Sequence, residues 1–393
     1  MIGHEPRKVF LVHGKRTAFG KFGGSLGGLT PVELAVIAAT SVFQDCAAPL
    51  DSIDQVIFAN VIPSTSDTLY AGRHLALKCG LPVETPALVI NRLCGSGIQA
   101  MIDAARLIRT GEAGALLVAG AENMTMAPHL TYGARFGTKY GPLVSKDLLL
   151  DTLYDKHAGL PMGMTAENLG EEYAVTRDDS DSYSFQSHTK ANAAYDRGLI
   201  QPEIAGVEQG KISCSKDEHL RTNVSLEELQ KLKPTFKKDG TVTAGSASGI
   251  VDGACAMIIA SEDYVLKHKL SPLAEIVTGE VVGVDPARMG IGPVPAIQRL
   301  LRRQEKRVSD IDLFEINEAF ASQVIACQRA LQIDPQKLNV WGGAVALGHP
   351  LGATGLKISL TLARQLRHYN KTYGVSAACI GGGQGIALLL KKV

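Results

Sequence analysis

Short apolar runs alternate along the chain with longer segments in which apolar residues recur every three or four positions. The runs are rich in β-branched residues, which predicts buried strands in KVFLVHG, QVIFANV, ALVINR and ALLVAGA. Residues 31–43 predict a helix, because the segment opens on Pro31 and its apolar residues follow the helical period. Strands that alternate with helices are typical of an α/β protein.

The chain also contains an internal repeat. Matching segments recur in the same order and at nearly the same spacing: 52–60 with 310–317, 94–97 with 349–355, and 116–120 with 374–378. The first pair and the last predict strands, and the middle pair are turns that lead into amphipathic helices predicted at 98–108 and 356–366. Three matches in register indicate a duplicated α/β unit.

A stretch of different character separates the two copies. Residues 123–244 carry more charge and fewer strand signals, with a helical pattern at 177–197. We interpret this stretch as an insertion that forms a loop domain. The predicted division is an N-terminal half of residues 1–122 plus about 245–270, the loop domain 123–244, and a C-terminal half 271–393.

Composition argues against several classes of protein. Of the 393 residues, 45% are hydrophobic and 20% are charged, as in an ordinary soluble globular protein. The 40 basic side chains nearly balance the 39 acidic ones, so no overall charge would attract nucleic acid. No run approaches the ~20 apolar residues that a membrane-spanning helix needs, and we expect no membrane insertion.

The cysteines and the N-terminus bear on the cellular compartment. The 7 cysteines are scattered and form no CxxC pair, which disfavours a disulfide scaffold and a thiolate zinc site, and no metal is expected. The start, MIGHEPRKVFLVHGKR, has no signal-peptide core and no long Arg- and Ser-rich amphipathic helix. We expect a cytoplasmic protein, with the mitochondrial matrix as the alternative.

Cys94 is the first candidate for chemistry. It follows the predicted strand ALVINR and precedes the predicted helix, so its sulfur would lie at a helix N-terminus. Unpaired N–H groups and the helix dipole favour a thiolate there. The alternative is a buried structural cysteine.

His349 lies in GGAVALGHPLGATG, which we interpret as a strand followed by a glycine-rich turn. A histidine before proline is often a turn residue with a satisfied hydrogen bond. The repeat, however, places this turn opposite the one that carries Cys94, and this favours a Cys–His pair.

Cys379 ends the predicted strand YGVSAAC and opens the glycine-rich turn that contains Gly381. Such a turn suits an oxyanion hole or a phosphate cradle; we prefer the first, because the P-loop ending and the GxGxxG pattern are absent. Asn317, at a predicted strand-to-helix junction, is either a helix cap or a catalytic polar group.

Taken together, NRLCGSG, NEAFA, GGAVALGHPLGATG and CIGGGQG resemble the active-site loops of the thiolase family, in that family's order and spacing. The resemblance covers essentially the whole chain. LPMGMTAENL, FGTKYG, KDGTVTAGSASG and MGIGPVPAI are similar to the mitochondrial 3-ketoacyl-CoA branch rather than to the short-chain biosynthetic branch. The implied fold has two pseudo-symmetric halves that form five layers, α-β-α-β-α, with an inserted loop domain.

The resemblance implies ping-pong acyl transfer between 3-ketoacyl-CoA or acetyl-CoA and CoA. Cys94 would carry the acyl group, His349 would take its proton, and Cys379 would be the second acid/base. Asn317 would hold a water, and the backbone N–H groups of Cys94 and Gly381 would form an oxyanion hole. The expected direction is thiolysis; the alternative is a biosynthetic acetyltransferase that makes acetoacetyl-CoA.

The resemblance also implies a set of substrate contacts. The expected CoA- and substrate-binding residues are Arg221, Phe236, Ala244, Ser248, Met162, Met289 and Phe320. Coenzyme A is expected as a substrate, with no permanently bound cofactor, and the protein is expected to form a homodimer or homotetramer. Without the resemblance, the methionines could equally be core residues and Arg221 part of a solvated face.

Three residues depart from the pattern of the family. Trp341 replaces the usual Asn and could alter the pocket, Pro161 replaces the His of the acetoacetyl-forming branch, and Thr354 replaces the commoner Ser. A ketoacyl synthase is disfavoured, because it would have His in place of Asn317 and no equivalent of Cys379. A thioesterase and a non-catalytic CoA- or lipid-binding protein remain as alternatives.

Overall fold

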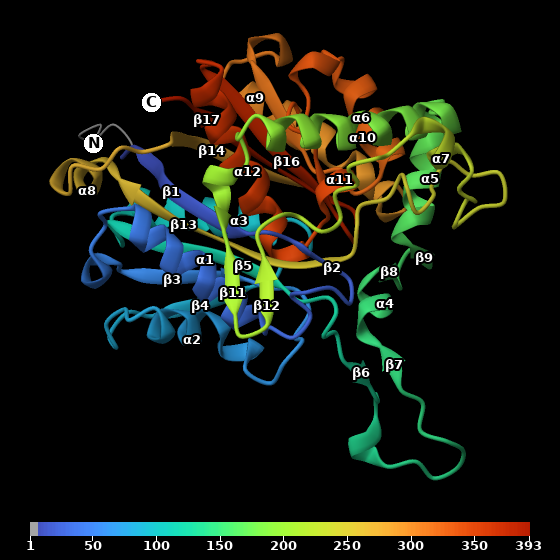
Figure 1. The fold of residues 1–393 in the computed structure, drawn as a ribbon, viewed down its shortest axis with the longest axis horizontal. Helices are drawn as coiled ribbons and strands as arrows, with labels where there is room; N and C mark the ends of the chain where they lie inside the picture. The colour runs from blue at the N-terminus through green and yellow to red at the C-terminus, as the bar shows by residue number, and fades with distance from the viewer. Residues whose placement is uncertain (1–6) are drawn as a thin grey trace.

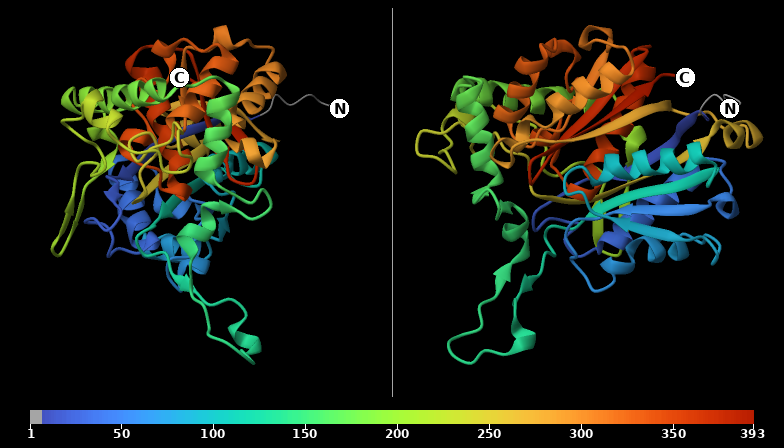
Figure 2. Two further views of the ribbon diagram at one scale, coloured as in Figure 1. Left: turned by 90° about the vertical axis from the view of Figure 1, so that its right-hand side faces the viewer. Right: turned by 180° about the vertical axis from the view of Figure 1, so that it is seen from behind.

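The computed structural model describes residues 7–393. The first six residues, part of the predicted N-terminal half and of the targeting argument, lie outside the described residues. An 11-stranded sheet runs through two lobes that face each other across a pair of central helices (Figure 1; Figure 2). This arrangement confirms the predicted α/β class.

The two lobes share one strand order, except that the first lobe has an additional edge strand. In the first lobe the strands are β4 (Ala87–Ile90), β3 (Gln55–Ala59), β5 (Ala115–Glu122), β13 (Val251–Ser261) and β1 (Val9–Thr17). In the second lobe they are β15 (Leu313–Ile316), β16 (Tyr373–Ile380), β17 (Gln384–Lys391) and β14 (Ala274–Gly283). The short strands β2 (Gly20–Lys21) and β10 (Ile204–Ala205) pair with β13 and β1.

Strand directions make the repeat explicit. β3 is parallel to β5, which continues antiparallel into β13 and β1; likewise β15 is parallel to β16, which continues antiparallel into β17 and β14. The lobes join where β1 pairs with β14 through Phe10–Glu275 and Leu11–Ala274. The predicted duplication is therefore confirmed.

Helices complete the five layers. The outer face of the first lobe is covered by α1 (Pro31–Asp45) and α2 (Ala71–Lys78), with α8 (Glu262–Lys267) at its edge. The second lobe is covered by α9 (Pro293–Arg303), beside which lies α10 (Ala321–Leu331). Between the lobes lie α3 (Ser96–Thr110) and α12 (Leu351–His368). All residues of β5 and β13 are buried, as expected of strands covered on both faces.

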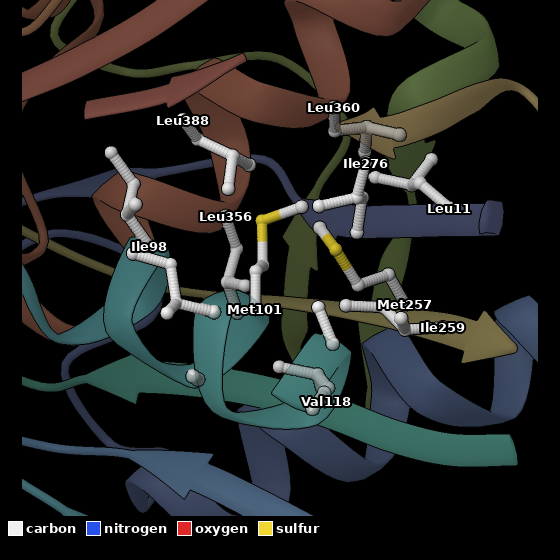
Figure 3. Packing of buried hydrophobic residues seen from close by; sticks show 14 of the residues in the cluster. Leu11, Ile98, Met101, Val118, Met257, Ile259, Ile276, Leu356, Leu360 and Leu388 are labelled. Atoms are coloured by element: carbon white, nitrogen blue, oxygen red, sulfur yellow. The ribbon is translucent and has the colours of Figure 1, made fainter. Parts of the chain in front are cut away.

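The core lies around the two central helices. Met101 and Ile98 of α3 and Leu356 and Leu360 of α12 pack with Met257 of β13 (Figure 3).

The backbones of α3 and α12 approach each other closely. A Cβ atom on Gly97 would lie only 2.6 Å from the backbone nitrogen of Leu356, and Gly355 faces the same contact from the other side. A side chain at Gly97 would push the helices apart. The segments that carry Cys94 and His349 lead into these two helices.

The inserted segment contributes helices and small hairpins. Its strands are β6 (His129–Leu130), β7 (Lys146–Asp147), β8 (Tyr154–Asp155), β9 (Leu160–Pro161), β11 (Val207–Gln209) and β12 (Ile212–Cys214). Its helices are α4 (Leu148–Thr152), α5 (Met162–Glu172), α6 (Arg177–Asp196) and α7 (Leu226–Gln230). Residues 129–147 form an arm that projects from the body (Figure 1). Within residues 7–393, no helix has the length and apolar character to cross a bilayer.

Candidate active site

Cys94 lies in the turn between β4 and α3, just before the helix begins at Ser96. Its side chain is half-buried and packs against an apolar cluster that includes Met124 and Leu351. Burial raises the pKa of the thiol to about 11, although the backbone N–H groups of Gly381 and of Cys94 itself lower it. The sequence argument that the helix N-terminus would favour a thiolate is therefore outweighed by burial, and the group is a thiol at neutral pH.

His349 lies on a buried loop that leads into α12. The prediction of a strand before it is wrong, because residues Ala344–Leu347 form the short helix α11, which packs against α6. A short apolar run has no periodicity that separates the two structures, so packing decides. Burial lowers the pKa of His349 to about 4, and its imidazole is neutral at pH 7.

Hydrogen bonds determine which nitrogen of His349 carries the proton. Thr354 Oγ1 lies 2.6 Å from His349 Nδ1 and donates its own hydrogen to the carbonyl oxygen of Pro350 at 2.9 Å. Because a hydroxyl has one hydrogen, Thr354 must accept from Nδ1–H. His349 Nε2 is therefore unprotonated, and it lies 3.4 Å from Asn317 Nδ2.

Asn317 follows β15 and does not cap a helix. Its backbone N–H donates to Ala377 of β16 at 2.9 Å, and α10 begins only at Ala321, with Phe320 at the N-cap. The helix-cap alternative is therefore wrong. Asn317 Oδ1 is buried and has no hydrogen-bond partner among the described residues. The side chain thus presents an acceptor next to the imidazole.

Cys379 is fully buried near the end of β16, before the turn that contains Gly381. Burial raises the pKa of its thiol well above the ordinary value, and interaction with Cys94 raises it further. The two thiols therefore lie in one site: Cys94 interacts with Cys379, and the backbone N–H of Gly381, two residues after Cys379, bonds the Cys94 sulfur. The site thus gathers Cys94 from the first lobe and Asn317, His349 and Cys379 from the second.

An apolar cavity of about 420 Å³ has His349 in its wall. Four of the expected substrate contacts line it, namely Met162, Phe236, Ser248 and Phe320. Met289 is buried behind the cavity, where it packs with Cys379 and Ala319. Ala244 and Arg221 are exposed and lie outside the lining, with the Arg221 backbone N–H bonded to His188 Nδ1 at 3.3 Å.

Except for Pro161, already noted as a departure from the family pattern, the rest of the lining was not anticipated from the sequence. The additional residues are Met124, Leu150, Leu153, Tyr154, Pro161, Gly163, Ala247, Gly249, Ile250 and Leu351. Several belong to the inserted segment, whose local patterns are those of ordinary short helices and hairpins. Trp341, suspected of altering the pocket, packs against α6 instead, and its indole N–H donates to Tyr369 at 3.1 Å.

The site combines a nucleophile, a base and an apolar cavity, which together suit acyl transfer. A thiol and a neutral imidazole with an unprotonated Nε2 share a buried site, as nucleophilic catalysis requires. The neighbouring cavity is apolar enough to hold an acyl chain. Residues 7–393 contain no group of three or more His, Cys, Asp or Glu that could hold a metal ion.

Comparison with known proteins gives the class of enzyme and its family. The chain is an acyltransferase, like the relatives that it matches. Two family models cover it, "Thiolase, N-terminal domain" at residues 9–263 and "Thiolase, C-terminal domain" at residues 270–392. It belongs to the thiolase family.

Individual relatives match over nearly their full length. Mitochondrial 3-ketoacyl-CoA thiolase of Homo sapiens is 48% identical over 98% of both chains, and beta-ketothiolase BktB of Cupriavidus necator is 40% identical over 98% of this chain and all of the relative. The crystal structure of the human mitochondrial enzyme with CoA has a TM-score of 0.97 at 48% identity, with 98% of each chain covered. Acetyl-CoA acetyltransferase of Bacillus anthracis has a TM-score of 0.96 at 37% identity, with both chains fully covered.

Proposed function

We propose that this thiolase cleaves 3-ketoacyl-CoA with free CoA as the acceptor, through an acyl group on Cys94. The observation that carries the proposal is the neutral His349, whose unprotonated Nε2 shares a buried site with the thiol and borders an apolar cavity. Support for the substrate class comes from the relatives named as 3-ketoacyl-CoA thiolases and from a neighbour that binds CoA.

In the first step, proton transfer accompanies attack. The pKa of Cys94 is about 11 and that of His349 about 4, so thiol and imidazole are both neutral at pH 7. His349 Nε2 takes the thiol proton as the Cys94 sulfur attacks the 3-keto carbonyl carbon. The backbone N–H groups of Cys94 and Gly381 stabilise the oxyanion, each worth about 2.7–4 kcal/mol by analogy with other oxyanion holes.

In the second step, the bond between the α- and β-carbons breaks and acetyl-CoA leaves as an enolate. The proton now on His349 Nε2 and a water held by Asn317 Oδ1 stabilise the enolate oxygen, and the Cys379 thiol protonates its carbon. The Cys379 thiolate then takes the proton of the incoming CoA thiol, whose sulfur collects the acyl group from Cys94. As the acyl group leaves, the Cys94 sulfur takes back the proton from His349 Nε2, and the enzyme returns to its starting state.

The finer assignments of binding and assembly belong to the same proposal. Phe236 and Ser248 would contact the pantetheine arm, together with Ala244, and Met162, Met289 and Phe320 would shape the acyl pocket. Arg221 would face the nucleotide end of CoA.

The division into residues 1–122 plus about 245–270, 123–244 and 271–393 also stays a prediction. Between the two compartments considered, the mitochondrial relatives favour the matrix.

A homodimer or homotetramer is proposed as well. The projecting arm carries exposed aromatic side chains, with Phe136 and Tyr140 91% and 99% exposed. Exposed large apolar side chains of this kind favour contact with another protein surface. Light scattering coupled to gel filtration gives the subunit number directly, and a monomer at micromolar concentration would contradict the proposal.

Thr354 offers a test of the histidine assignment. Replacing it with valine removes the acceptor for Nδ1–H, so a fraction of His349 adopts the wrong tautomer or orientation, and kcat is expected to fall roughly 10- to 100-fold. Thr354→Ser keeps the hydroxyl and should retain near-parental kcat. Steady-state thiolysis with both variants checks this, and equal activity of the valine and serine variants would contradict the assigned tautomer.

The substrate class is tested by following loss of 3-ketoacyl-CoA after addition of free CoA, with acetoacetyl-CoA and a longer 3-ketoacyl-CoA compared side by side. Cleavage of the longer substrate at least as fast as acetoacetyl-CoA is the expected result. Activity on acetoacetyl-CoA alone would make the protein a biosynthetic acetyltransferase instead. Consumption of acyl-CoA without free CoA would identify a thioesterase.

A further inference from the structure

Two buried carboxylates contact the loop that carries His349, although neither belongs to the proposed chemistry. Glu122 is the last residue of β5 in the first lobe, and Glu318 follows Asn317 in the second. Glu122 is 0% exposed and Glu318 is 1% exposed. A buried carboxylate is costly unless its oxygens are bonded, so the groups that bond them identify what each carboxylate stabilises.

Glu122 binds the start of α12. Its Oε1 accepts from Asn60 Nδ2 at 3.0 Å and from the backbone N–H of Ile62 at 2.8 Å, while Oε2 accepts from the backbone N–H groups of Val61 at 3.1 Å and Gly352 at 2.9 Å. Burial raises the pKa of Glu122 to about 8, yet none of its partners could accept a carboxyl proton. The geometry therefore assigns the ionised form.

Glu318 binds the other end of the same loop. Its Oε1 accepts from Tyr183 Oη at 2.8 Å and Asn339 Nδ2 at 2.9 Å, and its Oε2 from Ser187 Oγ at 2.7 Å and the backbone N–H of Val345 at 3.1 Å. The carboxylate also packs directly on Gly343, where a Cβ atom would collide with it. Glu318 thus joins α6 to the segment that leads to His349.

The two anchors bracket the imidazole. Val345 precedes His349 in the chain and Gly352 follows it, and each donates its backbone N–H to a carboxylate from a different lobe. Between them the His349 N–H donates to the carbonyl of Gly249 at 3.0 Å. The backbone of residues 345–352 is therefore tied to the first lobe, which carries Cys94, and to the second, which carries Asn317.

We propose that Glu122 and Glu318 are positioning residues that together clamp residues 345–352 and so set the place of His349 Nε2 between Cys94 and Asn317. The proposal rests on the proposed role of His349. Neither carboxylate lines the cavity, and the clamped segment contributes only His349 and Leu351 to its wall. Loss of a clamp therefore displaces the base, while the walls formed by other segments, such as Phe236, stay in place.

The test uses Glu122→Gln and Glu318→Gln in the full-length enzyme. Each change is isosteric and replaces an acceptor oxygen with a donor that opposes an N–H group. A misplacement of about 1 Å at a catalytic group can cost about 100-fold, so we expect kcat to fall about 10- to 100-fold with KM for 3-ketoacyl-CoA nearly unchanged. Circular dichroism confirms that the variants are folded.

Tyr183→Phe is the matched control. It removes one donor to Glu318 but leaves the contact with Val345, and its kcat should stay close to parental. The kcat of the double variant Glu122→Gln/Glu318→Gln should be only slightly below that of the less active single variant. A loop released at one end is already displaced, so loss of the second anchor adds little. If a Gln variant does not fold, the Asp variant, which is one methylene shorter, takes its place with the same expectation.

Several results would overturn the clamp. Parental kcat in the folded glutamate variants would do so, as would a rise in KM at constant kcat, an equal loss in Tyr183→Phe, or losses that multiply in the double variant. His349→Asn, measured alongside, distinguishes a failure of the proposed role of His349 from a failure of the clamp. If it has parental activity, the proposed role of His349 is wrong; if it is inactive while the glutamate variants are parental, only the clamp is wrong.

Discussion

Cys94→Ser is expected to abolish acyl transfer and leave the fold intact. Serine is nearly isosteric with cysteine, and the half-buried site accepts it without a cavity. Its hydroxyl is a far weaker nucleophile at neutral pH, and the nearby Ser96 hydroxyl is bonded to the backbone of Arg92 and Leu93. We expect kcat for thiolysis to fall by about 10⁴ to 10⁶.

Mass spectrometry of the intact protein measures the same prediction without turnover. The parental enzyme should gain the mass of one acyl group after incubation with acyl-CoA in the absence of free CoA, and Cys94→Ser should gain none. Cys79→Ser, a change at a partly buried cysteine beyond the end of α2, is the matched control and should behave like the parent. An acyl group found on another cysteine of the parent would contradict the nucleophile assignment.

Cys379→Ser should separate the two halves of the reaction. Acylation of Cys94 depends on His349 and should continue slowly, whereas proton exchange at the methyl group of acetyl-CoA needs the second acid/base. A positioned acid or base contributes about 10²- to 10⁴-fold, and exchange should fall by that factor. Deuterium uptake into acetyl-CoA, followed by NMR in heavy water, measures the exchange.

The control for Cys379 is its buried neighbour. Cys327→Ser changes a thiol whose Sγ is bonded to the Gly290 carbonyl at 3.3 Å, within the same lobe but outside the cavity lining. It should retain exchange at near-parental rate. Turnover of Cys379→Ser at the parental rate would show that another group moves the proton.

Much of the fold could be predicted from the sequence because the patterns were long or repeated. The helix at 31–43 begins where expected, since Thr30 and Glu33 bond each other's backbone as a capping box. The duplicated strands appear as β3 and β15 and as β5 and β16. The short run Ala344–Leu347 was wrongly predicted as a strand, because only its packing against α6 makes it helical.

The sequence predicted the reactive residues of the site but not the residues that position them. Cys94 and His349 stand at glycine-rich turns that the repeat superposes, which is a signal within the sequence. Glu122 and Glu318 gave no such signal, because their partners come from distant segments and only the folded chain brings those N–H groups together. The opposing effects of burial and the helix terminus on the Cys94 pKa also depend on atoms that sequence patterns do not place.

The contact between Gly97 and Gly355 has a consequence for how such an enzyme diversifies. Because the two central helices touch through their backbones, almost no substitution at this seam preserves the distance between the catalytic loops. The inserted segment, by contrast, supplies cavity residues such as Leu150, Tyr154 and Phe236 and lies outside the seam. A lineage can therefore exchange one acyl specificity for another by mutating a peripheral segment, while its reaction is inherited unchanged.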